Sequence, residues 1–227
     1  LEIGPGKGFL TKALLAKASK VIAVEKDRDL VPILKETFAA EIESKKLILV
    51  EEDIRDFSPA KWKLKNCEYK LVANIPYYIT GEIISSYLES SCQPKLMVLM
   101  VQREVAGRIV ARDGKESILS LAVKAYGKPT IARIVGRGSF TPAPNVDSAV
   151  IKIDSISKAF FDTFKEKAFF DLLHAGFAHK RKKLTSNLIE KYKGSTVIKA
   201  FQKLGIPEGI RAEDLGLSQW SELAKNI

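Results

Sequence analysis

The fold is decided by the opening stretch Leu1-Glu2-Ile3-Gly4-Pro5-Gly6-Lys7-Gly8, in which an apolar strand runs directly into a glycine-rich loop. Glycines let the chain turn sharply from a strand into a helix and let the backbone approach a ligand closely. A dinucleotide-binding loop would need a further glycine at position 9, which is Phe9, and a Walker loop would need Gly-Lys followed by Ser or Thr. Neither pattern is present, so the loop by itself indicates only a nucleotide-like ligand.

The first strand is short. Leu1 is not an initiator methionine, and only three residues precede Gly4, whereas a central strand usually has about five or six. We therefore expect the sequence to begin inside its first strand, with an N-terminal segment missing.

Strand and helix patterns alternate from this loop to residue 153. Such alternation predicts an α/β fold with a mainly parallel sheet covered by helices, whose ligands bind at the carboxyl ends of the strands. The later strands are expected at Val21–Val24, Leu47–Val50, Leu71–Ala73, Leu96–Val101, Ile131–Val135 and Ala149–Ile153. The helices between them are expected at Phe9–Lys17, Asp29–Ile42, Ile83–Leu88, Arg103–Arg112 and Ile118–Tyr126.

The pattern changes near residue 157, where strand signals stop. Helical periodicity then covers Phe161–Leu173, Thr185–Tyr192 and Val197–Leu204. We predict two domains, residues 1–157 and a small all-helical domain at residues 158–227. The second holds 13 Lys or Arg against 8 Asp or Glu, which gives it about twice the positive charge density of the first.

Composition narrows the class of protein. Hydrophobic residues make up 46% and charged residues 28%, so a disordered or fibrous protein is excluded, and the longest apolar run, Leu96–Val101, is too short to span a bilayer. The two cysteines, Cys67 and Cys92, exclude a disulfide framework and a cysteine-based zinc site, and they fit a reducing compartment. A net charge of +10 favours polyanionic partners, nucleic acid first and an anionic membrane second.

Acidic residues follow two of the predicted strands. Glu25 could accept the hydroxyls of a ribose, and Asp53 could accept from an adenine amino group while Ile54 packs on the ring. With the glycine loop they describe an adenosine site without a pyrophosphate site, which suits S-adenosylmethionine. The alternatives are a solvated carboxylate at a strand end for Glu25 and a plain loop or helix cap for Asp53.

The stretch Asn74-Ile75-Pro76-Tyr77-Tyr78 follows another predicted strand and is the most specific signal. An aromatic amine is a poor nucleophile because its lone pair is delocalised into the ring. Two acceptors, the Asn74 side-chain oxygen and the Pro76 carbonyl, would orient such an amine, and Tyr77 could stack on an extruded base. A proline turn with two tyrosines packed in a core is the alternative.

These motifs resemble those of the small-subunit ribosomal RNA adenine dimethyltransferase family of the bacterial KsgA type. Further stretches carry the same likeness along nearly the whole chain. They are Val101–Val105, Phe140–Ser148, Phe177–Leu184 and Arg211–Leu215.

The resemblance implies a Rossmann-like S-adenosylmethionine-dependent methyltransferase with a C-terminal helical RNA-binding domain. Such an enzyme adds two methyl groups to N6 of each of two adjacent adenosines near the 3′ end of small-subunit rRNA, and the family also acts in subunit maturation. The implied cofactor residues are Glu2, Gly4, Gly6, Glu25, Lys26, Asp53, Ile54 and Asn74. The implied catalytic residues are Asn74, Pro76 and Tyr77, with Phe140 bordering the target base. RNA contacts are expected at Arg103, Lys180, Arg181, Lys182 and Lys183, although a solvated helix face is the alternative for the run from 180 to 183.

Three other functions stay open at this point. Large-subunit rRNA methylases of the erythromycin-resistance type share the Asn-Ile-Pro-Tyr motif, although Arg211–Leu215 favours the small subunit. A ribosome-assembly factor with secondary methylation is compatible, and a DNA-binding transcription factor is disfavoured by the intact catalytic motif. We expect a cytoplasmic monomer that binds the small ribosomal subunit and has neither a membrane partner nor a metal site, since His174 and His179 lack further ligands at suitable spacing.

Overall fold

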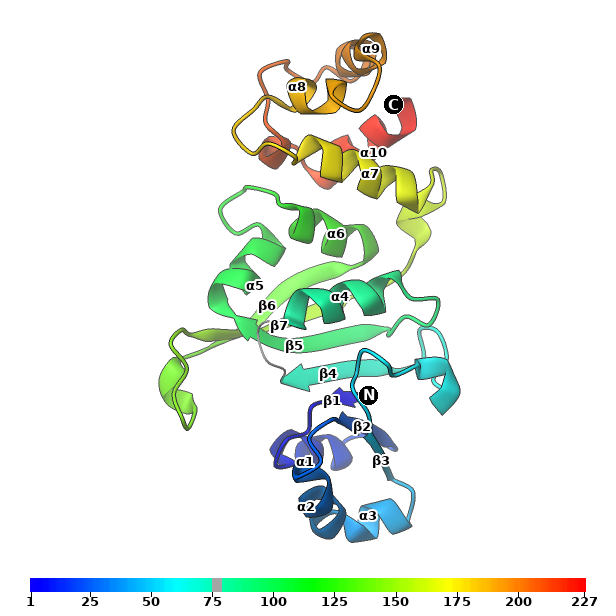
Figure 1. Cartoon of the computed structure of the whole chain (residues 1–227), viewed down its shortest axis with the longest axis vertical. Coiled ribbons are helices and arrows are strands. Elements are labelled where there is room, and N and C mark those ends of the chain that lie inside the picture. The colour runs from blue at the N-terminus through cyan, green and yellow to red at the C-terminus, as the bar shows by residue number, and fades with distance from the viewer. Residues whose placement is uncertain (75–78) are drawn as a thin grey trace. The chain divides into compact units, whose positions relative to one another are not determined.

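The computed structural model describes residues 1–74 and 79–227. Its centre is a seven-stranded sheet with the strand order β3-β2-β1-β4-β5-β7-β6 (Figure 1). The strands are β1 Glu2–Ile3, β2 Val21–Glu25, β3 Leu47–Glu51, β4 Lys70–Asn74, β5 Leu96–Gln102, β6 Lys128–Val135 and β7 Ser148–Asp154. Strands β1 to β5 are parallel, so the predicted α/β class is confirmed.

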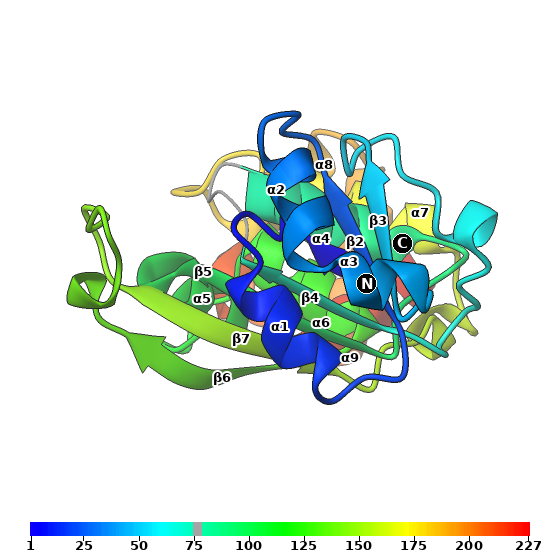
Figure 2. The same ribbon diagram turned by 90° about the horizontal axis from the view of Figure 1, so that it is seen from below.

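Strand β7 departs from the parallel arrangement. It pairs antiparallel with β5 and lies between β5 and β6, although β6 precedes it in the chain. An antiparallel neighbour can follow after a short connection, whereas a parallel one needs a long crossover. The turn after β6 therefore returns the chain directly into the sheet, and residues 136–147 form an arm that projects away from it (Figure 2).

The described helices follow most of the expected patterns. They are α1 Phe9–Leu15, α2 Leu30–Thr37, α3 Ala39–Glu43, α4 Thr80–Glu89, α5 Arg103–Val110, α6 Ile118–Tyr126, α7 Glu166–Gly176, α8 Leu184–Ile189, α9 Gly194–Leu204 and α10 Leu217–Asn226. The single helix expected at Asp29–Ile42 is divided at Phe38, whose φ of −116° leaves the helical range. None of the helices in the described residues is both long enough and apolar enough to cross a membrane.

The two faces of β2 and β3 are covered differently. Val21, Ala23 and Leu47 pack against the helices α1, α2 and α3. Ile22 and Val24 point to the opposite face and pack against the segment 54–64, which has no α-helix. This division follows from the alternation of side chains along a strand, and it leaves the segment after β3 lying over the sheet.

Contacts divide the chain into two compact units. The first comprises Leu1–Arg103 and Thr130–Ile156, and the second comprises Glu104–Pro129 and Ser157–Ile227. The predicted division at residue 157 placed residues 104–129 with the first domain, whereas the structure groups them with the C-terminal helices. The reason is that Leu121 and Ala125 of α6 are buried in the same core as Phe169 of α7 and Trp220 of α10.

Candidate functional site

Strand register brings the predicted site residues to one edge of the sheet. Ile3 at the end of β1 pairs with Val24 of β2 and with Ala73 of β4. The next residues of these strands, Gly4, Glu25 and Asn74, therefore meet at the carboxyl ends. Glu25 also pairs with Glu51 of β3, so Asp53 follows at the same edge. A sheet of this kind binds its ligand at the carboxyl ends of its strands, and this side of the sheet is here called the ligand edge.

The glycine loop has a backbone that other residues would adopt only with strain. Gly4 and Gly6 have φ values of +64° and +60°, and a Cβ at either position would meet no atom of the described residues within 4 Å. As far as the described residues show, open space therefore borders the loop on the side of these two glycines. Gly8 differs, because a Cβ there would lie 2.5 Å from the Phe38 ring. Gly4 and Gly6 thus line a space, while Gly8 permits close packing of α1.

Glu25 is anchored to the glycine loop. Its Oε2 accepts the Gly6 backbone N–H at 3.1 Å, and its Oε1 accepts the N–H groups of Lys26 at 2.9 Å and Asp27 at 3.0 Å. The side chain is buried, yet one acceptor position on Oε2 remains for a hydroxyl. Glu25 therefore supports the glycine loop through its backbone, a role that the sequence did not reveal.

Asp53 is held by a neighbour that sequence analysis did not single out. Arg55 Nη2 lies 2.6 Å from Oδ2, while Arg55 Nε and the Arg55 backbone N–H each donate to Oδ1 at 3.0 Å. Lys26 Nζ lies 4.0 Å from Oδ2. These donors hold the pKa of Asp53 well below its usual range, chiefly through the hydrogen bonds from Arg55. These contacts favour the ionised, acceptor form of Asp53.

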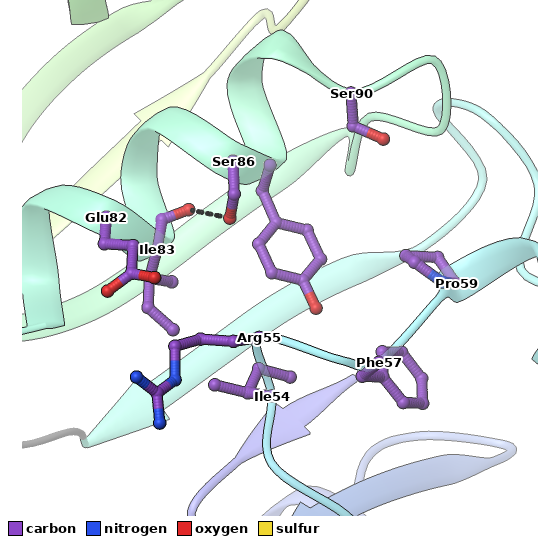
Figure 3. Close-up of a pocket in the computed structure, with 9 residues that line it drawn as sticks. Ile54, Arg55, Phe57, Pro59, Glu82, Ile83, Ser86 and Ser90 are labelled. Atoms are coloured by element: carbon purple, nitrogen blue, oxygen red, sulfur yellow. Dashed lines mark hydrogen bonds between the residues drawn. The ribbon is translucent and has the colours of Figure 1, made fainter.

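A pocket of about 180 Å³ lies between the segment that follows β3 and helix α4. The segment after β3 contributes Ile54, Arg55, Phe57 and Pro59 to its lining, and α4 contributes Glu82, Ile83, Ser86, Tyr87 and Ser90. Arg55 and Glu82 lie on the same side of this pocket (Figure 3). Ile54, the residue after Asp53, is one of the apolar residues that line this pocket.

Glu2, the first residue of β1, is fully buried. The side chain has no exposed surface, and neither carboxyl oxygen has a hydrogen-bond partner in the described part of the chain. Burial raises its pKa to about 7, and the nearby Thr11 hydroxyl, which is not in hydrogen-bond geometry, opposes that shift. The structure therefore buries this predicted cofactor residue completely, at the start of β1.

The predicted catalytic residues are only partly described. Asn74 is the last residue of β4, pairs with Met100 of β5 and is exposed at the ligand edge. Pro76 and Tyr77 lie outside the described residues. Asn74 is therefore the catalytic candidate whose position next to Gly4 follows from the strand register.

Phe140 lies in the arm between β6 and β7 and is half-buried. The arm leaves the sheet at the ligand edge, because Ser148 at the start of β7 pairs with Gln102 at the end of β5. Arg103 follows Gln102 directly, and its guanidinium lies 3.4 Å from Asp147. Arg103 is thus paired with a carboxylate at the base of the arm.

The basic run at 180–183 lies in the exposed turn between α7 and α8, not on a helix. Lys182 pairs with Glu190 at 2.9 Å, and His179 lies 3.3 Å from the same carboxylate. Lys180, Arg181 and Lys183 have no ion pair among the described residues. These three cations are therefore available to a polyanion, in the second compact unit.

The described residues fit S-adenosylmethionine. Among the described residues, open space borders Gly4 and Gly6, and the carboxylates of Glu25 and Asp53 each keep an acceptor position at the carboxyl ends of the strands. Among the described residues no group of three or more His, Cys, Asp or Glu could hold a metal ion. The donor set thus suits an adenosine-containing cofactor.

Comparison with known proteins agrees with this geometry. The family model described as ribosomal RNA adenine dimethylase matches residues 1–227. A Dehalococcoides mccartyi protein named ribosomal RNA small subunit methyltransferase A is 40% identical over 225 residues, which cover 98% of this chain and 76% of that protein. A Lactococcus lactis protein of the same name is 38% identical, with 99% of this chain and 78% of that protein covered.

Solved structures share the fold. A dimethyladenosine transferase from Plasmodium falciparum is 26% identical with a TM-score of 0.81, covering 98% of this chain and 86% of that one. The 23S rRNA methyltransferase ErmE has a TM-score of 0.76 at 23% identity, covering 99% and 88%, and shows the fold alone. The chain belongs to the ribosomal RNA adenine dimethylase family and is an S-adenosylmethionine-dependent methyltransferase.

Proposed function

We propose that the protein transfers methyl groups from S-adenosylmethionine to N6 of two adjacent adenosines near the 3′ end of small-subunit rRNA, forming N6,N6-dimethyladenosines. The observation that carries this proposal is the match of the dimethylase family to the whole chain, together with relatives near 40% identity that are named small-subunit enzymes. The ligand edge supports it, since Gly4, Glu25, Asp53 and Asn74 meet there.

Bound S-adenosylmethionine supplies a methyl group on a positively charged sulfur. Glu25 would accept a ribose hydroxyl and Asp53 the adenine amino group, which holds the adenosine at the strand ends. Asn74 would accept a hydrogen of the target amine at its side-chain oxygen and thereby fix the direction of the nitrogen lone pair. Orientation of this kind lowers the activation barrier, because the entropic cost of aligning the nitrogen lone pair with the methyl group has already been met on binding.

The methyl group would pass directly from sulfur to nitrogen in one step, without a covalent enzyme intermediate. The carbon–sulfur bond breaks as the carbon–nitrogen bond forms, and the electron pair stays on sulfur in S-adenosylhomocysteine. The alkylated nitrogen is then cationic and strongly acidic, so its proton leaves to water. The Asn74 side-chain oxygen, which would accept a hydrogen bond from the amine, would stabilise the positive charge as it develops on the nitrogen.

We further propose that the enzyme acts as a monomer in the cytoplasm on the small ribosomal subunit and takes part in its maturation. The net charge of +10 supports an RNA partner. The exposed cations Lys180, Arg181 and Lys183 offer the second unit a phosphate-binding surface.

Labelled methyl transfer tests the function. Undermethylated small subunits and matched large subunits are incubated with the protein and radiolabelled S-adenosylmethionine. We expect label in small subunits, recovered as N6,N6-dimethyladenosine from adjacent positions. Label in large subunits alone would instead assign the protein to the erythromycin-resistance type, and label in neither particle would contradict the proposal.

A further inference from the structure

Asp53 has almost all of its acceptor capacity in use. A carboxylate offers about four lone-pair positions. Oδ1 accepts both the Arg55 backbone N–H and Arg55 Nε, each at 3.0 Å, and Oδ2 accepts Arg55 Nη2 at 2.6 Å. Lys26 Nζ, at 4.0 Å from Oδ2, is beyond hydrogen-bond distance. One acceptor position on Oδ2 is left, which matches a single N–H donor.

Arg55 holds this carboxylate from two directions. Its guanidinium is a planar fork that grips both oxygens, and its backbone N–H fixes Oδ1. Glu82 of α4 lies on the same side of the adjoining pocket as Arg55 (Figure 3) and favours the charged guanidinium. The Asp53 side chain is only 21% exposed, so the paired carboxylate has little freedom to turn toward water.

We propose that Arg55 is a positioning residue that makes the purine subsite select a 6-amino group over a 6-oxo group. This inference rests on the proposed function, in which Asp53 accepts from the adenine amino group. An ionised, immobile carboxylate accepts an amino hydrogen, whereas a 6-oxo oxygen would face it with like charge. A carboxylate without the fork could rotate or take up a proton, and the selection would weaken.

Binding of two cofactor products tests the proposal. S-adenosylhomocysteine and its deaminated analogue S-inosylhomocysteine differ in the 6-amino and 6-oxo groups of the purine and in N1, which is an acceptor in the first and an N–H donor in the second. Calorimetry on the full chain gives both Kd values, and the N6-methyl derivative of S-adenosylhomocysteine, which keeps an N–H on N6 and an acceptor at N1, serves as a reference. A hydrogen bond to a charged acceptor corresponds to a preference of about 10- to 100-fold for the amino form. We expect Arg55→Met to reduce that preference about tenfold, mainly by weakening S-adenosylhomocysteine, and Arg55→Lys to restore part of it.

Two further variants show whether an effect of Arg55→Met is specific to the contact between Arg55 and Asp53. Arg28→Met is the matched control, because Arg28 also pairs with a strand-end carboxylate, Glu51, at 3.7 Å, and we expect it to leave the preference unchanged. Asp53→Asn should abolish the preference, since an amide can present either a donor or an acceptor.

The outcomes separate the inference from the function. An unchanged preference in Arg55→Met, with the preference lost in Asp53→Asn, would overturn the role of Arg55 and leave the cofactor site standing. An unchanged preference in Asp53→Asn would overturn both the role of Arg55 and the assignment of Asp53. Failure of the wild-type chain to bind either compound would contradict the proposed cofactor site itself, which methyl transfer checks independently.

Discussion

Asp147 and Arg103, 44 positions apart, join the start of β7 to the end of β5. The Arg103 guanidinium lies 3.4 Å from Asp147 Oδ2, and the Arg103 backbone N–H donates to the Asp147 carbonyl at 2.9 Å. Asp147 Oδ1 also accepts the Arg137 backbone N–H at 3.1 Å. Asp147 thus holds both ends of the arm, residues 136–147, near the end of β5. Phe140 is part of this arm, so its position depends on these contacts.

The first prediction concerns this fastening. Asp147→Ala should lower methyl-transfer turnover on the order of tenfold, because a displaced arm misplaces the target base. The pair is half-exposed, so the free energy of unfolding should fall by less than about 1 kcal/mol. S-adenosylhomocysteine affinity should stay the same. Asp154→Ala, which removes the 2.7 Å pair with Lys152 at the other end of β7, is the control, and an equal loss of turnover there would contradict a specific role for Asp147.

The second prediction concerns Glu25. Glu25→Ala removes the acceptor of the Gly6, Lys26 and Asp27 N–H groups as well as the ribose contact. We expect cofactor affinity to fall at least tenfold and the free energy of unfolding to fall by roughly 1–3 kcal/mol. Calorimetry and urea unfolding measure the two effects. Glu51→Ala on the neighbouring strand, whose side chain is 48% exposed, should change neither appreciably.

The third prediction concerns Asn74. Asn74→Ala should lower the single-turnover rate about 100-fold while leaving the Kd of S-adenosylhomocysteine within about threefold, since the contact strengthens only as the nitrogen is alkylated. Rapid-quench single-turnover assays and calorimetry separate the two quantities. A normal rate with weak cofactor binding would show that Asn74 serves the cofactor and not the amine.

The fourth prediction separates the cations of the turn between α7 and α8. The triple variant Lys180→Ala, Arg181→Ala, Lys183→Ala should weaken binding to small subunits and reduce the log–log salt slope by roughly 2–3, because three phosphate contacts are lost. Lys182→Ala is the matched control, since Lys182 is already paired with Glu190. Filter binding at several salt concentrations gives the slopes. Equal slopes for the triple variant and the wild type would place the RNA contact elsewhere.

The fifth prediction concerns pH. Burial raises the pKa of Glu2 to about 7 from an ordinary value of 4.5, so between these pH values the folded state binds more protons than the unfolded state. The free energy of unfolding therefore has its full contribution from Glu2 below pH 4.5, where the carboxyl is protonated in both states. This contribution falls by on the order of 3 kcal/mol as the pH rises to about 7. Glu2→Gln should flatten the fall of melting temperature between pH 5 and 8. An unchanged slope would mean that Glu2 is ionised in the fold.

Local features of the candidate site were predictable from the sequence. The strand before each site residue is a short buried apolar run, and a strand of this kind ends where polar residues begin. Glu25, Asp53 and Asn74 could therefore be placed at carboxyl ends before any contact was known. Their meeting at one edge was also predictable, because parallel strands share an edge.

Contacts between distant or differently facing side chains were not predictable in this way. Periodicity shows which face a residue occupies but not which residue it meets. The burial of Glu2, the grip of Arg55 on Asp53 and the pairing of Arg103 with Asp147 all depend on three-dimensional placement. Helix α10 was missed as well, since Ser218, Gln219 and Ser221 dilute an apolar stripe whose role appears only when Trp220 packs on the other helices.

The sequence by itself thus determined the alternation of strands and helices, the glycine loop and the acids that follow the strands, because these depend on neighbours along the chain. Only the tertiary structure decided that β7 enters the sheet antiparallel beside β5 and that α6 joins the C-terminal core. The physical reason is that strand pairing and core packing select among partners far apart in the sequence. That selection is made by the shape and burial of the whole fold rather than by any local pattern.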